Sequence, residues 1–181
     1  MSKEKETNQK RGIVLVTCGD GKGKSTAGFG MVFRSAGWGK RVLVIQFIKG
    51  KWGTGEEKAA KAFDNIEWHS LGDGFTWDTK NPEQDKKTAE EAWEFAQKKI
   101  LSGHYDLVFL DEINYCMGYG WLDGGQVVKF INEIKPPEVS LILSGRNPSL
   151  EVLEVADTVT EMTLKKHAYK SGIKAKKGIE F

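Results

Sequence analysis

Residues 17–26, which read TCGDGKGKST, carry the residue types that a phosphate-binding loop needs. Glycines let backbone N–H groups converge on phosphate oxygens, Lys24 supplies a mobile positive charge, and the hydroxyl of Ser25 can hold Mg²⁺. The alternative is a flexible turn without a ligand. The nucleotide-binding residues that this pattern predicts are Gly19, Asp20, Gly21, Lys22, Gly23, Lys24, Ser25 and Thr26.

The surroundings of the loop favour the phosphate site over the turn. An apolar run at 13–16 precedes the loop and a helical stretch at 27–36 follows it, which places the positive end of a helix dipole next to a bound anion. The usual motif has about four residues between its first glycine and Gly-Lys-Ser/Thr. Cys18 stands where that first glycine is expected, so the loop is one residue tighter than the common form.

Two acidic residues follow an apolar run farther along the chain. Residues 107–110 have the pattern of a buried strand, and Asp111 and Glu112 come directly after it. Open α/β sheets bind ligands at the carboxyl ends of their strands. The sequence therefore predicts that Asp111 and Glu112 join Ser25 in a Mg²⁺ site or position a water, the alternative being a solvated strand end.

Arg146 occupies the corresponding position after a third strand. The apolar run at 139–145 delivers its guanidinium to the same sheet edge, where the charge of a triphosphate needs a partner. We therefore predict Arg146 to be both nucleotide-binding and catalytic, together with Lys24. The alternative is a surface arginine at the start of a loop.

Apolar runs alternate with helical segments, which indicates an α/β protein with a mostly parallel sheet covered by helices on both faces. Asn81-Pro82 fits the N-cap and first turn of a long helix, and Pro136-Pro137 ends another helix before a strand. We expect one domain of P-loop NTPase (RecA-type) architecture over 11–181, preceded by a mobile segment or lid at 1–10. The expected strands are at 13–16, 42–47, 107–110, 141–143 and 158–162.

Composition limits the possible partners. The net charge of +2 over 181 residues gives no reason to expect nucleic acid, and the lysines after residue 164 have the pattern of a solvated basic tail. Cys18 and Cys116 have neither metal-ligand spacing nor a disulfide framework. No apolar run approaches the roughly twenty residues of a membrane span, so we expect a cytoplasmic enzyme without a membrane partner.

Six blocks of the sequence, in this order, resemble the ATP:corrinoid adenosyltransferases, the family that makes adenosylcobalamin. The tight glycine loop is what that family carries. Two positions depart from its usual pattern: Asp20 stands where Asn is more common, and Ser25 where Thr is usual. The resemblance extends from about residue 12 to the C-terminus. The blocks lie at 19–26, 46–50, 74–77, 110–112, 144–146 and 166–169.

The resemblance implies an enzyme that uses ATP as an alkylating agent. Reduced cobalt, Co(I), of a corrinoid attacks the 5′ carbon of the ribose and triphosphate leaves. ATP and the reduced corrinoid are then the substrates, Mg²⁺ the cofactor, and a reductase or flavin the electron donor. The family also implies a homodimer. Phe75 and Trp77 would lie against the corrin and displace its lower axial base, which eases reduction of Co(II).

The sequence leaves two other functions open. A P-loop kinase or ATPase would share the loop and the sheet but release ADP or phosphate. A nucleotide-dependent module that binds a corrinoid without chemistry would need no turnover. His69 lies in a segment that superficially resembles a cobalamin-binding motif, yet Glu67 replaces its Asp, and we expect a structural or surface role. The sequence does not decide which corrinoid is preferred or whether the enzyme acts in salvage or in de novo synthesis. It also leaves open the roles of His167 and Asp20.

Overall fold

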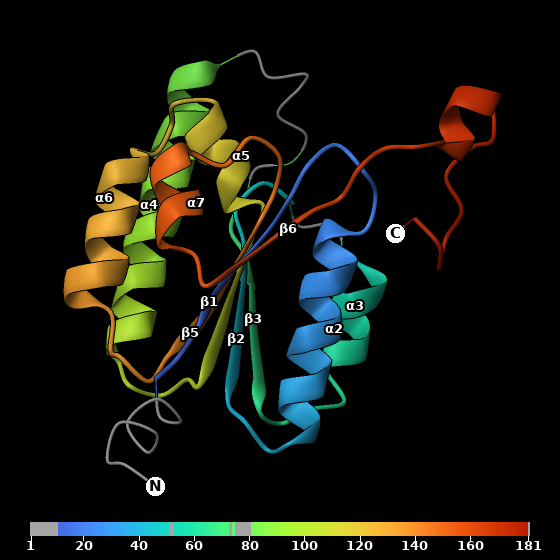
Figure 1. Ribbon diagram of the computed structural model, residues 1–181. Helices are drawn as coiled ribbons and strands as arrows, with labels where there is room; N and C mark the ends of the chain where they lie inside the picture. The colour runs from blue at the N-terminus through green and yellow to red at the C-terminus, as the bar shows by residue number, and fades with distance from the viewer. Residues whose placement is uncertain (1–10, 51–52, 73, 75–80, 181) are drawn as a thin grey trace, which may run out of the picture.

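The computed structural model describes residues 11–50, 53–72, 74 and 81–180. A six-stranded parallel sheet with strand order β3-β2-β4-β5-β1-β6 forms its centre (Figure 1). The segment 1–10, expected to be a lid, and the aromatic pair Phe75 and Trp77 lie outside the described residues. The strands are β1 Val14–Cys18, β2 Val42–Gln46, β3 Ile66–Ser70, β4 Leu107–Asp111, β5 Ser140–Ser144 and β6 Thr158–Glu161.

Helices cover both faces of this sheet (Figure 1). On one face lie α2 Lys24–Gly37 and α3 Gly55–Ala60, and on the other α4 Pro82–Leu101, α6 Gly124–Lys129 and α7 Leu150–Val155. The remaining elements are α5 Ile113–Gly118, the π-helical turn η2 Phe130–Ile134 and the 3₁₀ turn η3 Ala168–Ser171. The predicted α/β architecture with a parallel sheet is confirmed. No helix in the described part of the chain is long and apolar enough to cross a membrane.

The side chains of a central strand pack into two hydrophobic cores, one on each face of the sheet. In β4, Val108 and Leu110 join the core under α4, whereas Leu107 and Phe109 join the core under α2. Successive side chains of a strand point to opposite faces, so a strand covered on both faces needs an uninterrupted apolar run. This requirement explains why the central strands can be recognised in the sequence as continuous apolar runs.

The long helix begins and packs as its sequence predicts. The side chain of Asn81 accepts a hydrogen bond from the backbone N–H of Gln84 at 3.3 Å, and Pro82 opens the first turn. The predicted apolar stripe is buried in the core under the sheet and consists of Ala89, Ala92, Trp93, Ala96 and Ile100.

The register of the strands brings polar residues to one edge of the sheet. Gln46 is the last residue of β2 and pairs with Asp111, the last residue of β4, and Thr17 of β1 pairs with Ser144 of β5. All these strands are parallel, so their carboxyl ends meet at the edge from which the loop after β1 departs. This is the edge at which the sequence places the nucleotide site.

Candidate active site

The glycine loop after β1 has the backbone conformation that its sequence requires. Gly19 and Gly23 have φ of 89° and 118°, in the left-handed region that favours glycine. The N–H of Gly21 donates to the carbonyl of Met162 at 2.6 Å, and a Cβ on Gly21 would lie 2.6 Å from that same oxygen. The segment that follows β6 therefore packs against the tight loop and holds its backbone in place.

The helix that follows the loop presents uncapped N–H groups. Helix α2 is 14 residues long, its N-cap is Gly23, and no side chain of the described residues caps it. The first N–H groups of a helix have no intrahelical partner and carry partial positive charge, which favours a bound anion. Lys24 stands at the first position and its Nζ donates to the carbonyl of Gly21 at 2.7 Å. Burial, followed by the charge of Arg146, lowers the pKa of Lys24.

Two hollows adjoin this loop and share Lys22, Lys24 and Glu180. We call the first the Glu112 hollow; it measures ≈ 240 Å³, and the second, the His167 hollow, measures ≈ 370 Å³. The Glu112 hollow is lined by Lys22, Gly23, Lys24, Ser25, Thr26, Lys49, Thr54, Glu56, Glu112, Tyr115, Gly145 and Glu180. The His167 hollow is lined by Asp20, Gly21, Lys22, Lys24, Arg146, Leu164, His167, Tyr169, Lys170 and Glu180.

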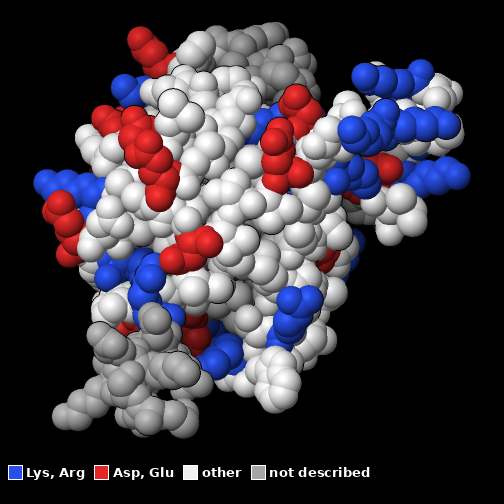
Figure 2. Space-filling view, in the orientation of Figure 1, with Lys and Arg blue, Asp and Glu red and all other residues white. Residues whose placement is uncertain are grey.

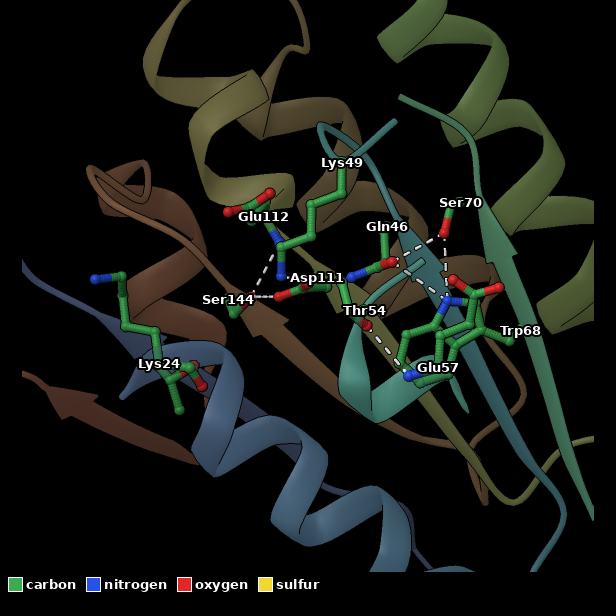
Figure 3. Close-up of polar contacts among 11 residues, drawn as sticks. Lys24, Gln46, Lys49, Thr54, Glu57, Trp68, Ser70, Asp111, Glu112 and Ser144 are labelled. Atoms are coloured by element: carbon green, nitrogen blue, oxygen red, sulfur yellow. Dashed lines mark hydrogen bonds and ion pairs between the residues drawn. The ribbon is translucent and has the colours of Figure 1, made fainter. Parts of the chain in front are cut away.

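Asp111 lies beneath the Glu112 hollow and does not line it. Its side chain is fully buried, and its Oδ1 accepts a hydrogen bond from Ser144 Oγ at 2.8 Å. Its Oδ2 accepts from Gln46 Nε2 at 2.9 Å and from Lys49 Nζ at 3.0 Å (Figure 3). Both carboxylate oxygens therefore already have partners within the protein.

Glu112 is held differently. Its backbone is left-handed, with φ of 69°, and its N–H donates to Ser144 Oγ at 2.9 Å. Its Oε2 is buried and has no hydrogen-bond partner among the described residues. Burial, reinforced by the charge of Asp111, raises the pKa of Glu112 to about 7, although Lys49 and Lys24 oppose the shift. A buried carboxylate oxygen without a partner, in the hollow that Ser25 also lines, is suited to a cation.

Arg146 and Asp20 both line the His167 hollow and form an ion pair. Arg146 Nε lies 3.5 Å from Asp20 Oδ1, and the Asp20 side chain is 75% exposed. The unusual carboxylate of the loop is thus paired with the arginine that we predict to bind nucleotide. The described residues contain no group of three or more His, Cys, Asp or Glu side chains able to hold a metal by themselves. A metal here would need further ligands from substrate or water.

The C-terminal segment forms the outer wall of the site. Lys22 of the loop pairs with Glu180 at 2.5 Å, and His167 Nδ1 accepts from the N–H of Tyr169 at 3.2 Å. Lysines gather on this segment (Figure 2) and are solvent-exposed, which agrees with a basic tail. They are Lys165, Lys166, Lys170, Lys174, Lys176 and Lys177.

His69 lies in neither hollow. Its Nε2 is 2.6 Å from Glu67 Oε1, and its ring packs edge-on against Phe95 at 4.7 Å between centroids. Among the contacts that the structure describes, those of His69 are with neighbouring side chains of β3 and α4. This setting agrees with the structural role expected of it.

Sequence reasoning missed Lys49 as a site residue. Lys49 lines the Glu112 hollow and contacts Asp111. A signal for it exists in the sequence, because a charged residue that closely follows a buried strand is the same pattern that singled out Asp111 and Arg146. Ser144 and Gln46, the other partners of Asp111, carry no such signal, since a polar residue at the end of a strand is common.

The parallel sheet, the glycine loop and the helix that begins at Lys24 define a P-loop nucleotide-binding α/β protein. Within this class the chain belongs to the ATP:corrinoid adenosyltransferases, since the family model described as ATP:corrinoid adenosyltransferase BtuR/CobO/CobP matches residues 10–181. The resemblance seen in the sequence is confirmed, and the protein is an enzyme of this family.

Relatives of similar length support the assignment. The chain is 44% identical to a corrinoid adenosyltransferase of Sinorhizobium sp, over 100% of this chain and 89% of the relative. It is 43% identical to that of Pseudomonas aeruginosa, over 97% and 87% of the two chains. It is 40% identical to the corrinoid adenosyltransferase of Escherichia coli (strain K12), over 97% of this chain and 89% of the relative.

Proposed function

We propose that this enzyme transfers the 5′-deoxyadenosyl group of ATP to Co(I) of a corrinoid and binds the leaving triphosphate at the glycine loop. The observation that carries the proposal is the convergence of the uncapped start of α2, Lys24 and Ser25 on the Glu112 hollow. An electron pair of cobalt forms the bond to the 5′ carbon. The bond from that carbon to the α-phosphate oxygen breaks, and triphosphate keeps its electrons.

Lys24 and Arg146 have the same role in this reaction. Negative charge grows on the triphosphate as the carbon–oxygen bond breaks, so cations near its oxygens stabilise the transition state more than the bound substrate. The loop N–H groups add to this effect. No general base is needed, because the nucleophile is a metal electron pair rather than a hydroxyl group.

Ser25 and Glu112 are the residues that we propose to hold Mg²⁺. Ser25 and Glu112 line one hollow, the Oε2 of Glu112 has no hydrogen-bond partner among the described residues, and phosphate and water oxygens would complete the shell. When bound, Mg²⁺ would offset part of the polyphosphate charge. Asp111, the third residue of the predicted metal set, already accepts hydrogen bonds at both oxygens. We therefore place it behind the direct ligands.

The corrinoid site is proposed from the resemblance. Phe75 and Trp77 remain the proposed corrin contacts. The position of the residue before them supports this proposal. The N–H of Gly74 donates to the carbonyl of Ile48 at 3.1 Å, so Gly74 lies next to the segment that carries Lys49 into the Glu112 hollow.

Partners and location are also proposed from the resemblance. We propose a reductase or flavin as electron donor, a homodimer and a cytoplasmic location. Sedimentation at micromolar concentration tests the dimer, and a fully active monomer would contradict it.

The reaction products distinguish the proposed function from its alternatives. The full chain is incubated anaerobically with ATP, Mg²⁺ and chemically reduced cobalamin, with a Lys24→Ala variant as control. We expect adenosylcobalamin and triphosphate in equal amounts, and a loss of about a hundredfold in the variant. Stoichiometric ADP or orthophosphate would indicate a kinase or ATPase. Tight binding of both substrates without product would indicate a binding module.

A further inference from the structure

A chain of buried and half-buried polar side chains crosses the carboxyl edge of the sheet. Gln46 of β2 donates to Asp111 of β4 at 2.9 Å, and Ser144 of β5 donates to the other oxygen of Asp111 at 2.8 Å. The Oε1 of Gln46 accepts from Ser70 Oγ at 2.9 Å and from Trp68 Nε1 at 3.2 Å, which extends the chain to β3 (Figure 3). Four adjacent strands thus fix the carboxylate of Asp111 in one orientation.

Lys49 is the member of this network that reaches a hollow. Its Nζ lies 3.0 Å from Asp111 Oδ2 and 5.6 Å from the centroid of the Phe29 ring. Its side chain is 32% exposed and lines the Glu112 hollow together with Lys24 and Ser25. An ammonium group has three N–H donors, so the contact with Asp111 leaves donors for a ligand in the hollow.

The surroundings keep Lys49 charged. Burial by itself would lower its pKa, but the charges of Asp111 and Glu112 and the hydrogen bond to Asp111 outweigh burial, and the pKa is raised. The third lysine of the hollow, Lys22, is paired with Glu180 at 2.5 Å. Lys24 and Lys49 have no such ion pair with a glutamate of the hollow in the part of the chain that the structure describes.

Asp111 is poorly placed to bind a metal ion directly. A carboxylate has about four lone-pair positions, and three hydrogen bonds already use the two oxygens of Asp111. A metal ion on Oδ2 would also lie beside the positive charge of Lys49. The geometry instead suits Asp111 to holding the ammonium group of Lys49 in place.

We propose that Lys49 is a second lysine of the triphosphate site, in contact with phosphate oxygens beside Lys24, and that Asp111 positions Lys49 rather than binding Mg²⁺. This inference rests on the proposed function, since it concerns the same triphosphate. The sequence groups Asp111 and Glu112 as one metal site, and the proposal gives them different roles. Glu112 binds Mg²⁺, whereas Asp111 positions the ammonium group of Lys49, which contacts the triphosphate.

Binding of inorganic triphosphate tests the role of Lys49 without turnover. Isothermal titration of the full chain with triphosphate and Mg²⁺ compares wild type with Lys49→Met, Lys49→Arg and the exposed-lysine control Lys98→Met. We expect Lys49→Met to weaken binding by about tenfold or more, as for a lost charged hydrogen bond. Lys49→Arg should recover most of that loss, and Lys98→Met should bind like wild type. Binding of adenosine, which lacks phosphates, should not change.

A double-variant comparison tests the role of Asp111. Lys49→Met leaves a buried carboxylate without its cation, which endangers folding, and Lys49→Met/Asp111→Asn removes that charge. If Asp111 acts through Lys49, Asp111→Asn weakens triphosphate binding in wild type but causes no further loss in the Lys49→Met background. A further loss there, accompanied by a weaker dependence on Mg²⁺, would overturn the positioning role. Thermal melting of each variant confirms that it is folded.

The outcomes separate this inference from the proposed function. If Lys49→Met binds triphosphate as wild type does while Lys24→Ala does not, the assignment of Lys49 is wrong and the proposed function stands. If wild type does not bind triphosphate at all, the proposed function fails and the inference fails with it.

Discussion

Glu112 combines a left-handed backbone, with φ of 69°, and a buried carboxylate oxygen that lacks a partner among the described residues. Each feature costs free energy: a non-glycine residue in this region costs about 1 kcal/mol or more, and an unpaired buried acceptor costs about as much. Strained and unsatisfied groups gather at functional sites, where the ligand supplies what the protein lacks. Glu112 is therefore the single residue at which a substitution most directly tests the proposed cation site.

We predict that Glu112→Gln stabilises the ligand-free protein at alkaline pH. The pKa of Glu112 is raised to about 7, so the unfolded chain releases this proton at lower pH than the folded chain. The free energy of unfolding then falls as pH rises from about 4.5 to about 7, by about 3 kcal/mol in total. Urea unfolding should show a gain of about 2 to 3 kcal/mol for the variant at about pH 8 and little gain at about pH 5.

The exposed variant Glu154→Gln is the control and should show no such pH dependence. An equal effect of Glu112→Gln at both pH values would contradict the raised pKa. Activity should fall in the Glu112→Gln variant although its stability rises, because an amide is a weaker ligand for Mg²⁺ than a carboxylate.

Residue types and spacing led to the prediction of the loop residues and Glu112, because glycines and a lysine between a strand and a helix are the pattern of a phosphate site. The sequence did not separate Asp111 from Glu112. The two carboxylates are adjacent in the chain, but Asp111 is the last residue of β4 and is 0% exposed, whereas Glu112 leaves the strand with a left-handed backbone and lines the hollow. The hydrogen bonds of Asp111 come from distant strands and loops, and such contacts leave no local mark in the sequence.

At the scale of an element, the edge strand β3 pairs with β2 through its backbone and is joined to α4 through the side chain of Glu67. Its Oε1 accepts from Lys99 Nζ at 2.5 Å and lies 2.6 Å from His69 Nε2, and the hydroxyl of Tyr105 donates to its Oε2. Lys99 belongs to α4 and Tyr105 to the loop before β4. One carboxylate thus joins the edge of the sheet to the helix that covers it.

We predict that Glu67→Gln destabilises the protein near neutral pH and not in acid. Burial would raise the pKa of Glu67, but the hydrogen bonds from Lys99, Tyr105 and His69 outweigh burial and lower it to about 2. The stabilisation is therefore complete above about pH 4.5 and is lost as pH falls toward about 2. The side chain is 38% exposed, and solvent screening limits the contribution to about 1 kcal/mol.

Urea unfolding at about pH 7 and about pH 2.5 checks this prediction. Glu90, which forms an exposed pair with Lys86 at 3.8 Å, provides a control in Glu90→Gln with an effect of a few tenths of a kcal/mol. If Glu67→Gln lowered the free energy of unfolding by the same amount in acid, packing of the Glu67 side chain rather than its charge would be the stabilising contribution.

Strand β3 is also the strand that is missing from the set expected from the sequence. Its five residues mix apolar and polar types, and each is half-buried because the strand lies at the edge of the sheet. The central strands β2 and β4 are fully buried and appear in the sequence as apolar runs. The other edge strand, β6, is expected from the β-branched run at 158–162 although its side chains are exposed. Strand β3 has neither a continuous apolar run nor such a β-branched run, and its backbone pairing with β2 leaves no local signal in the sequence.

At the scale of the whole molecule, the site is assembled from distant parts of the chain. The loop after β1 contacts Met162 and Glu180, and the Glu112 hollow combines residues from several regions between 22 and 180. The order of these parts can be predicted from the sequence, and the parallel sheet explains why several of them meet. The arrangement of the C-terminal segment against the loop depends on tertiary contacts, and neither periodicity nor composition predicts it.

The described residues that precede the proposed corrin contacts lie along the same edge of the sheet. The N–H of Leu71 donates to the carbonyl of Gln46 at 3.0 Å, and a Cβ on Gly72 would lie 2.3 Å from the Ile48 carbonyl carbon. Only glycine fits there without displacing the chain that follows β2. The close approach at Gly72 therefore joins the segment after β3 to the segment that carries Lys49 into the Glu112 hollow.

We predict that replacing Phe75 and Trp77 by alanine impairs the reaction from Co(II)cobalamin far more than the reaction from pre-reduced Co(I)cobalamin. The resemblance assigns these aromatics to displacing the lower axial base, which makes Co(II) easier to reduce, and this task is complete when Co(I) is supplied. Transfer itself depends on the phosphate site. If the aromatics only packed in the core, both rates would fall equally. The free energy of unfolding would then fall as well, by about 3 kcal/mol or more for a buried aromatic. Measuring both rates and a melting curve, with the 81% exposed Trp38 replaced by alanine as control, separates the two roles. Equal loss in both assays would remove Phe75 and Trp77 from the corrinoid site.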